Sequence, residues 1–195
     1  MTEILAEYLP EASVVLVEDI LQKHPIYIKI VNNRTSKHGD FKRDLNGNFS
    51  ITINKTLNNY QFLLTLIHEI AHFVTYKQAK NVKPHGKEWK QNFQHLMLPF
   101  LNPSIFPNNL LPLLAKYLKN PKASTSSDVN LTYALKQFDH KLEKNYIFEL
   151  EHGSVFTFNN RIFKKGNKRR TRFECVEIST NKIYLFNQNA EVKQH

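Results

Sequence analysis

The stretch TLIHEIAHFVTYKQAKNVKPHGKEW, Thr65 to Trp89, decides the fold and the chemistry that this sequence predicts. Its apolar residues recur at helical spacing, and within it His68-Glu69-Ile70-Ala71-His72 fits the pattern H-E-x-x-H. Residues four apart on a helix point the same way, so both imidazoles can reach one metal ion. Zinc suits imidazole nitrogen, and Glu69 is placed to take a proton from metal-bound water. The pattern therefore predicts a zinc site on a helix of about residues 60–80.

A catalytic zinc site needs a third protein ligand, and three side chains further along the chain are candidates. His85 stands in a Pro-His-Gly sequence that allows a sharp turn, and the loop after His72 is long enough to return over the helix. Glu88 lies on the charged side of a second predicted helix that starts near residue 87, and His95 lies further along it. We favour His85 as the third ligand and keep Glu88 as the alternative.

The rest of the chain before residue 120 predicts a mixture of helices and strands. Two short helices are expected at 2–9 and 11–23, and the loop RTSKHGD follows a strand at 25–33. Asn46-Gly47 predicts a tight hairpin turn before a strand at 49–54. Asn58 and Asn59 can cap the long helix, and further helices are expected at 110–119 and 131–141.

From Tyr146 the pattern changes to short strands with turn residues between them, which predicts a small antiparallel β unit. The expected strands are YIFEL, SVFTFN, RIFKKG, TRFECVEI and KIYLFN. We therefore predict an α+β protein with three parts. They are a metalloprotease domain at 1–120, a linker and helix at 121–145, and a basic β unit at 146–195.

The formal net charge of the 195 residues is +10, and two stretches hold most of it. Lys77 to Lys90 contains Lys77, Lys80, Lys83, Lys87 and Lys90 against one glutamate. The second stretch has no acid and contains Arg161, Lys164, Lys165, Lys168, Arg169, Arg170 and Arg172. Such clusters indicate either a solvated face or an anionic partner, of which nucleic acid is the commonest.

The single cysteine, Cys175, excludes a disulfide framework and a cysteine-rich zinc site within one chain. It is expected to pack in a strand like a small apolar residue. The N-terminus has no signal-peptide pattern, and no apolar run approaches the length of a membrane span. We expect a cytoplasmic monomer that does not bind membranes.

The segment LIHEIAHFV followed by PHGKEWKQNF resembles the SprT-like metalloproteases, the bacterial SprT proteins and their eukaryotic relative Spartan. The resemblance covers about residues 15–100 and rests on H-E-x-x-H paired with a downstream H-G-x-x-[FW]. It implies a zincin-like fold in which strands precede the active-site helix. It also implies that His68, His72 and His85 bind one Zn²⁺ and that Glu69 is the general base. Many SprT proteins end in a four-cysteine zinc ribbon, which this chain cannot form, so we read residues 146–195 as a metal-free, degenerate ribbon.

The predicted function is that of a zinc-dependent peptidase of SprT-like type, in which metal-activated water attacks a peptide bond. The Spartan branch cuts proteins crosslinked to DNA, which would explain the basic stretches as contacts to DNA without sequence specificity. Two other readings remain. One is a zinc-stabilised nucleic-acid-binding protein with little or no proteolytic activity, and the other is a peptidase whose charge serves solubility alone. Tyr76, one helical turn after His72, is a candidate for stabilising the oxyanion.

Overall fold

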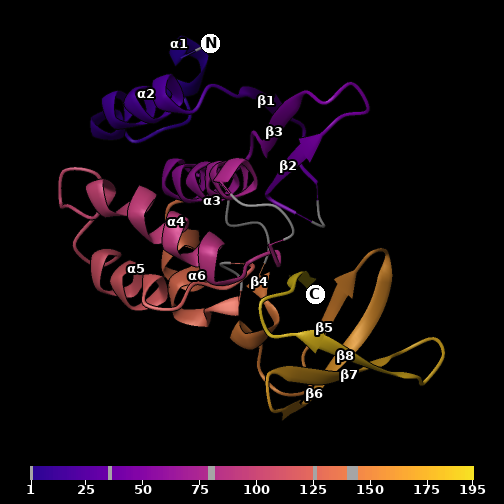
Figure 1. The fold of residues 1–195 in the computed structure, drawn as a ribbon. Coiled ribbons are helices and arrows are strands. Elements are labelled where there is room, and N and C mark those ends of the chain that lie inside the picture. The colour runs from indigo at the N-terminus through magenta and orange to yellow at the C-terminus, as the bar shows by residue number, and fades with distance from the viewer. Residues whose placement is uncertain (1, 35–36, 79–81, 125–126, 140–144) are drawn as a thin grey trace. The chain divides into compact units, whose positions relative to one another are not determined.

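The structure is a computed structural model that describes residues 2–34, 37–78, 82–124, 127–139 and 145–195 (Figure 1). It is mixed α+β, and the chain divides into two compact units, which are described separately. Unit 1 comprises Met1–Thr125 and Tyr133–Asp139, and unit 2 comprises Ser126–Thr132 and His140–His195. None of the described helices is long and apolar enough to cross a membrane.

Unit 1 opens with three short helical elements. They are α1 (Thr2–Ala6), the 3₁₀ turn η1 (Glu11–Ser13) and α2 (Val14–Lys23). Two helical segments were predicted here, and both are found. The first ends earlier than predicted, at Ala6, and the second begins with a 3₁₀ turn directly after Pro10.

A three-stranded sheet follows, with the strand order β1-β3-β2. Its members are β1 (Tyr27–Val31), β2 (Gly39–Arg43) and β3 (Phe49–Asn54). β2 and β3 form the predicted hairpin, in which Gly47 takes a positive φ of 87° and its N–H donates to the Asp44 carbonyl. β1 pairs with β3 in parallel, so β2 is an edge strand. The prediction that Gly39 and Asp40 belong to a loop was wrong, because they pair with Ile53 and Thr52.

The long helix α3 (Asn59–Gln78) lies between this sheet and α4 (Lys87–Met97), as Figure 1 shows. Asn58 caps α3 as predicted, since its side-chain oxygen accepts a hydrogen bond of 2.9 Å from the Gln61 backbone N–H. The apolar residues of α3 that flank the H-E-x-x-H motif are buried, namely Leu66, Ile67, Ile70, Ala71 and Phe73. The later helical elements are η2 (Leu98–Phe100), α5 (Leu111–Leu118) and α6 (Val129–Lys136).

Unit 2 contains a six-stranded sheet with the order β4-β9-β5-β6-β7-β8 and antiparallel pairs throughout. Its elements are β4 (Asn145–Tyr146), η4 (Ile147–Glu149), β5 (Val155–Phe158), β6 (Arg161–Arg169), β7 (Arg172–Glu177), β8 (Ile183–Asn187) and β9 (Glu191–Gln194). The stretch YIFEL was predicted as a strand, but most of it forms a 3₁₀ turn. Strand β9 was not predicted at all.

The core of unit 2 is aromatic. Phe156, Phe163 and Phe173 are buried together with Cys175, which packs as a small apolar residue as predicted. These three phenylalanines are thus core residues of the β unit, and Phe158 packs against the same cluster.

Candidate metal centre

The geometry of α3 brings the two histidines of the H-E-x-x-H motif together on one side of the helix. The Nε2 atoms of His68 and His72 lie 3.2 Å apart. The Nε2 atom of His85 lies 2.9 Å from that of His72 and 3.2 Å from that of His68. Among the described residues these three form the one group of three or more His, Cys, Asp or Glu side chains that could hold a metal ion.

The spacing of these three nitrogen atoms fits a zinc ion. Ligands at 2.0–2.1 Å from zinc in tetrahedral geometry lie about 3.3–3.4 Å from one another. The observed separations of 2.9–3.2 Å are close to that value. Hydrogen bonds alone do not account for such a triangle, because each neutral imidazole has one N–H and each ring nitrogen points along one direction. A cation that accepts all three lone pairs satisfies them at once.

The turn before α4 places His85. His85 has a positive φ of 56°, follows Pro84, and lies in a turn closed by a 2.8 Å hydrogen bond from Gly86 N–H to the Lys83 carbonyl. Proline followed by a residue with positive φ is the pattern of a type II turn. Gly86 is needed for a close approach, because a Cβ at this position would lie 2.8 Å from the Lys83 carbonyl oxygen.

Trp89 supports the imidazoles from behind. It is buried on α4, and its ring centroid lies 4.6 Å from those of His68 and His85 and 5.3 Å from that of His72. Its indole N–H donates a 3.4 Å hydrogen bond to the backbone carbonyl of His68. Phe93 stacks on the indole ring with a centroid separation of 5.1 Å, and its ring centroid lies 5.6 Å from that of His68. Packing therefore holds the three rings in place.

The three imidazoles stay neutral at neutral pH. Burial, with smaller contributions from the neighbouring histidines, lowers the pKa of His68 from 6.5 to about 3. Burial and the proximity of His85 lower that of His72 to about 4. Burial also lowers the pKa of His85. Since a metal ion binds the unprotonated ring, these shifts keep the ligand atoms available without a competing proton.

Glu69 lies between α3 and the edge strand β2. Its side chain is only 7% exposed, and burial together with the nearby Asp40 raises its pKa from 4.5 to about 7. The backbone N–H of Phe41 donates a hydrogen bond to the carboxylate and limits this rise. A carboxylate with a pKa near the working pH is suited to accept and release a proton.

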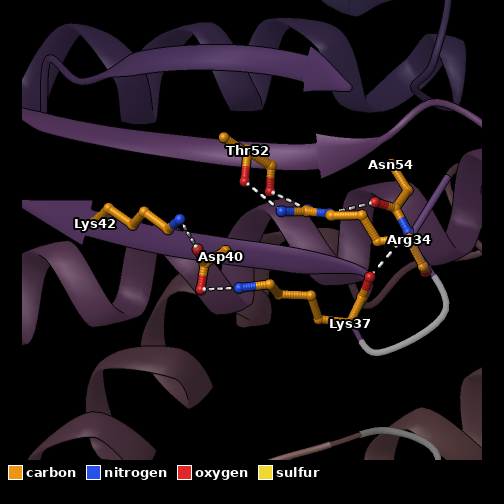
Figure 2. Close-up of polar contacts among 6 residues, drawn as sticks. All are labelled: Arg34, Lys37, Asp40, Lys42, Thr52 and Asn54. Atoms are coloured by element: carbon orange, nitrogen blue, oxygen red, sulfur yellow. Dashed lines mark hydrogen bonds and ion pairs between the residues drawn. The ribbon is translucent and has the colours of Figure 1, made fainter. Parts of the chain in front are cut away.

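A polar network lies on the face of the three-stranded sheet that points away from α3, and it holds the segment that leads into β2 (Figure 2). The Arg34 guanidinium donates to the side chains of Thr52 and Asn54, each at 2.9 Å. The fully buried Asn54 amide donates to the Lys37 carbonyl at 2.9 Å. Asp40 stands between Lys37 and Lys42, at 3.0 and 3.2 Å from their ammonium nitrogens. These contacts fix the start of β2 beside Glu69.

The other candidate ligands lie away from this cluster. Glu88 and His95 are exposed on α4 and are not among the converging groups. Tyr76, considered for the oxyanion, packs against Phe41 and Phe49, and its hydroxyl accepts a 3.1 Å hydrogen bond from Arg43.

Most basic side chains proposed as nucleic-acid contacts are at the surface. Those that are exposed are Lys77, Lys83, Lys87, Lys164, Lys168, Arg169, Arg170 and Arg172, and Lys90 is partly exposed. Lys80 lies outside the described residues. The structure corrects the prediction at Lys165, which is 5% exposed. Its ammonium group donates to the Leu150 carbonyl and lies 4.1 Å from the ring centroid of Phe173, because this position of β6 faces the core.

Two contributions to the site were not predicted. Trp89 was noted as part of the H-G-x-x-[FW] pattern without a role, although its place four residues after His85 could have suggested one. The approach of β2 to Glu69 could not be read from the sequence, because it depends on how the strand docks on α3.

Three converging imidazoles beside a buried carboxylate are a donor set of the kind that can hold a zinc ion. Residues 19–105 match the SprT-like family. Protein SprT from Yersinia enterocolitica serotype O:8 / biotype 1B (strain NCTC 13174 / 8081) is 38% identical over 53 residues. The match covers 25% of this chain, and the chain spans 31% of the length of that relative. No solved structure matches the chain.

Proposed function

We propose that this chain is a zinc-dependent peptidase of SprT type with a zincin-like core formed by the three-stranded sheet and α3. The observation that carries the proposal is the convergence of three imidazole Nε2 atoms, within 3.2 Å of one another, one residue from the buried Glu69. The SprT-like family, which is generally associated with metalloprotease-type proteins, supports the same reading.

His68, His72 and His85 would hold one Zn²⁺, and three protein ligands are the number that catalytic zinc sites use. Zinc, when bound, polarises water and a carbonyl oxygen as a Lewis acid. Trp89 and Phe93 shield one side of the imidazoles from water and keep the rings in place. The chain thus supplies a preorganised ligand set from α3 and from the turn before α4.

Glu69 would act as the general base. Its carboxylate takes a proton from the water that attacks the scissile carbonyl and later delivers it to the leaving amine. The raised pKa makes the carboxylate a stronger base than an exposed glutamate, while the Phe41 N–H keeps it oriented. Binding of zinc alone does not require a carboxylate at this position, which favours an enzyme over a binding protein.

Zinc content and chelation test this function. We expect about one zinc per chain by elemental analysis of the purified protein, and cleavage of an unstructured protein such as casein. Chelation should abolish cleavage and added Zn²⁺ should restore it, because the three imidazoles are the proposed metal ligands. A folded protein that lacks zinc, or cleavage that resists chelation, would contradict the proposal.

We also propose that DNA is a partner and that DNA-associated proteins are substrates. The supporting observation is the hairpin of β6 and β7, where exposed basic residues gather at the turn. They are Lys168, Arg169, Arg170 and Arg172, of which Arg169 is paired with Glu174 at 2.9 Å. Contacts from such residues to phosphates give binding that is independent of sequence and sensitive to salt.

Replacing these four residues by alanine should weaken binding of a single-stranded oligonucleotide, measured by fluorescence anisotropy at several salt concentrations. The plot of log K against log salt should become shallower by about 2–3, since each lost phosphate contact contributes about 0.7. The matched control removes the same charge from exposed lysines of unit 1, namely Lys23, Lys55, Lys116 and Lys119. Equal effects of both variants would show that net charge alone attracts the DNA.

The alternative of a zinc-stabilised nucleic-acid-binding protein would show this DNA binding without proteolysis. The boundaries of the three predicted parts, the monomeric state and the cytoplasmic location stay predictions.

A further inference from the structure

Gly39 begins the edge strand β2 at the point where this strand meets the helix of the proposed active site. His38 C=O accepts a hydrogen bond from Asn54 N–H, and Asp44 N–H donates to Asn48 C=O. Because backbone hydrogen bonds alternate in an antiparallel pair, the N–H groups of residues 39 and 41 point away from β3. The Phe41 N–H is thus free to donate to the Glu69 carboxylate, and such a bond lowers the pKa of this carboxyl.

Space, and not backbone conformation, requires glycine at position 39. A Cβ added to Gly39 would lie 2.7 Å from Thr65 Cγ2, 2.8 Å from Glu69 Oε1 and 2.9 Å from Glu69 Cγ. Each of these distances is shorter than real Cβ contacts. The positive-φ residues of this chain do not include Gly39, so its backbone conformation is open to other residues.

The helix cannot yield easily at this contact. Thr65 and Glu69 are one turn apart on α3 and face β2 together. The Thr65 hydroxyl donates a 2.7 Å hydrogen bond to the Gln61 carbonyl, which fixes its rotamer, and the residue is 7% exposed. A larger residue at position 39 must therefore displace either the strand or the Glu69 side chain.

We propose that Gly39 is a positioning residue for Glu69: the missing side chain lets the β2 backbone close on the carboxylate, so that the Phe41 N–H orients it. This proposal rests on the proposed function of Glu69 as general base. The zinc ligands lie on α3 and in the turn before α4, so they do not depend on the contact. A substitution at Gly39 should therefore alter the orientation of the Glu69 carboxylate without altering the binding of the metal.

The first test is the variant Gly39→Ala, assayed for zinc content, kcat and KM. We expect zinc to stay near one per chain, kcat to fall about 10- to 100-fold and KM to change less than about threefold, because a small misplacement of a catalytic group costs rate. The control is Ser50→Ala, which removes a side-chain atom elsewhere in the same sheet and should leave kcat within about twofold. Unchanged kcat, or a loss of zinc that parallels the loss of rate, would overturn the proposal.

A second test does not depend on enzymatic activity. Gly39→Ala should lower the melting temperature by about 4 °C or more in the wild-type background. In the Glu69→Ala background the fall should be smaller, because the Cγ and Oε1 atoms that oppose the new methyl group are absent and only the contact with Thr65 Cγ2 remains. An equal fall in both backgrounds would show that Gly39 does not act through Glu69. If the wild type cleaves no protein, the proposed function fails. The comparison of melting temperatures in the two backgrounds would still decide whether Gly39 and Glu69 are sterically coupled.

Discussion

The variant Glu69→Gln is expected to lose proteolysis by a factor of about 10²–10⁴ while its zinc content stays near one per chain. The factor is the usual contribution of a positioned general base, which the neutral amide cannot replace. The zinc content should persist because the three imidazoles, and not the carboxylate, converge within 3.2 Å. Casein cleavage and elemental analysis on the same preparation check both parts.

The pH dependence of the wild type is part of the same prediction. The rate of proteolysis should rise with pH as the Glu69 carboxyl loses its proton. The pKa of this carboxyl in the metal-free protein is about 7. A nearby cation favours the ionised carboxylate, so the midpoint should lie at or below pH 7 when zinc is bound. In the Gln variant any residual activity should lack this rise.

A stability measurement on the metal-free protein controls for damage to the fold. The folded-state pKa of Glu69 is raised above its ordinary value of 4.5, so the folded protein loses stability as pH increases from about 4.5 to about 7, and the loss is complete above that range. The Gln variant should therefore be more stable than the wild type at pH 8, by up to about 3 kcal/mol, and no more stable at pH 4. Chemical denaturation at the two pH values measures the difference.

Two outcomes would separate the competing functions. Unchanged proteolysis in the Gln variant would refute the general-base mechanism. A wild type that binds zinc and DNA but cuts no protein would support the nucleic-acid-binding alternative.

The variant His85→Ala is expected to lose most of its zinc. Loss of a residue that only hydrogen-bonds to a metal ligand lowers metal affinity about 10- to 100-fold. Removing one of the three converging ligands should lower the zinc affinity by more than that. After dialysis against a weak chelator, we expect well under half a zinc per chain, and proteolysis should fall with it. Elemental analysis measures the zinc content, and a chelator competition assay measures the zinc affinity.

Glu88→Gln is the matched control for that experiment, because Glu88 was the alternative third ligand and is exposed outside the cluster. It should keep a full zinc. If His85→Ala kept its zinc and Glu88→Gln lost it, the third ligand would be Glu88, and the turn at Pro84 would need another explanation.

The sequence alone predicted the elements whose signals are local. The helix expected over about 60–80 is α3, Asn59–Gln78, because apolar periodicity and the Asn58 cap agree. The hairpin turn at Asn46-Gly47 follows from a residue pair that accepts positive φ. The four-residue spacing of His68 and His72 fixes their relation on any helix, and the structure brings His85 to them as expected.

The features that sequence patterns missed depend on contacts between distant segments. The parallel pairing of β1 with β3 produces no recognisable pattern in the sequence of either strand. The composition of His38-Gly39-Asp40 is typical of a turn, although Gly39 begins strand β2. Lys165 was taken for a surface residue because its charge, and not its register in β6, was visible. Trp89 was visible, but its contact with all three imidazoles became clear only from the packing of α3 on α4.

The closeness of the three proposed ligands along the chain bears on how the protein is made. No two of them are more than 17 positions apart, and Trp89 lies four residues after His85. Closing such a short loop costs little chain entropy, and segments of low contact order assemble early. We expect the emerging polypeptide to capture its metal once α4 has left the ribosome, before the strands of unit 2 have been synthesised. The metal would then serve as a clamp for the nascent N-terminal half, and zinc scarcity would act first on newly made chains and not on finished ones.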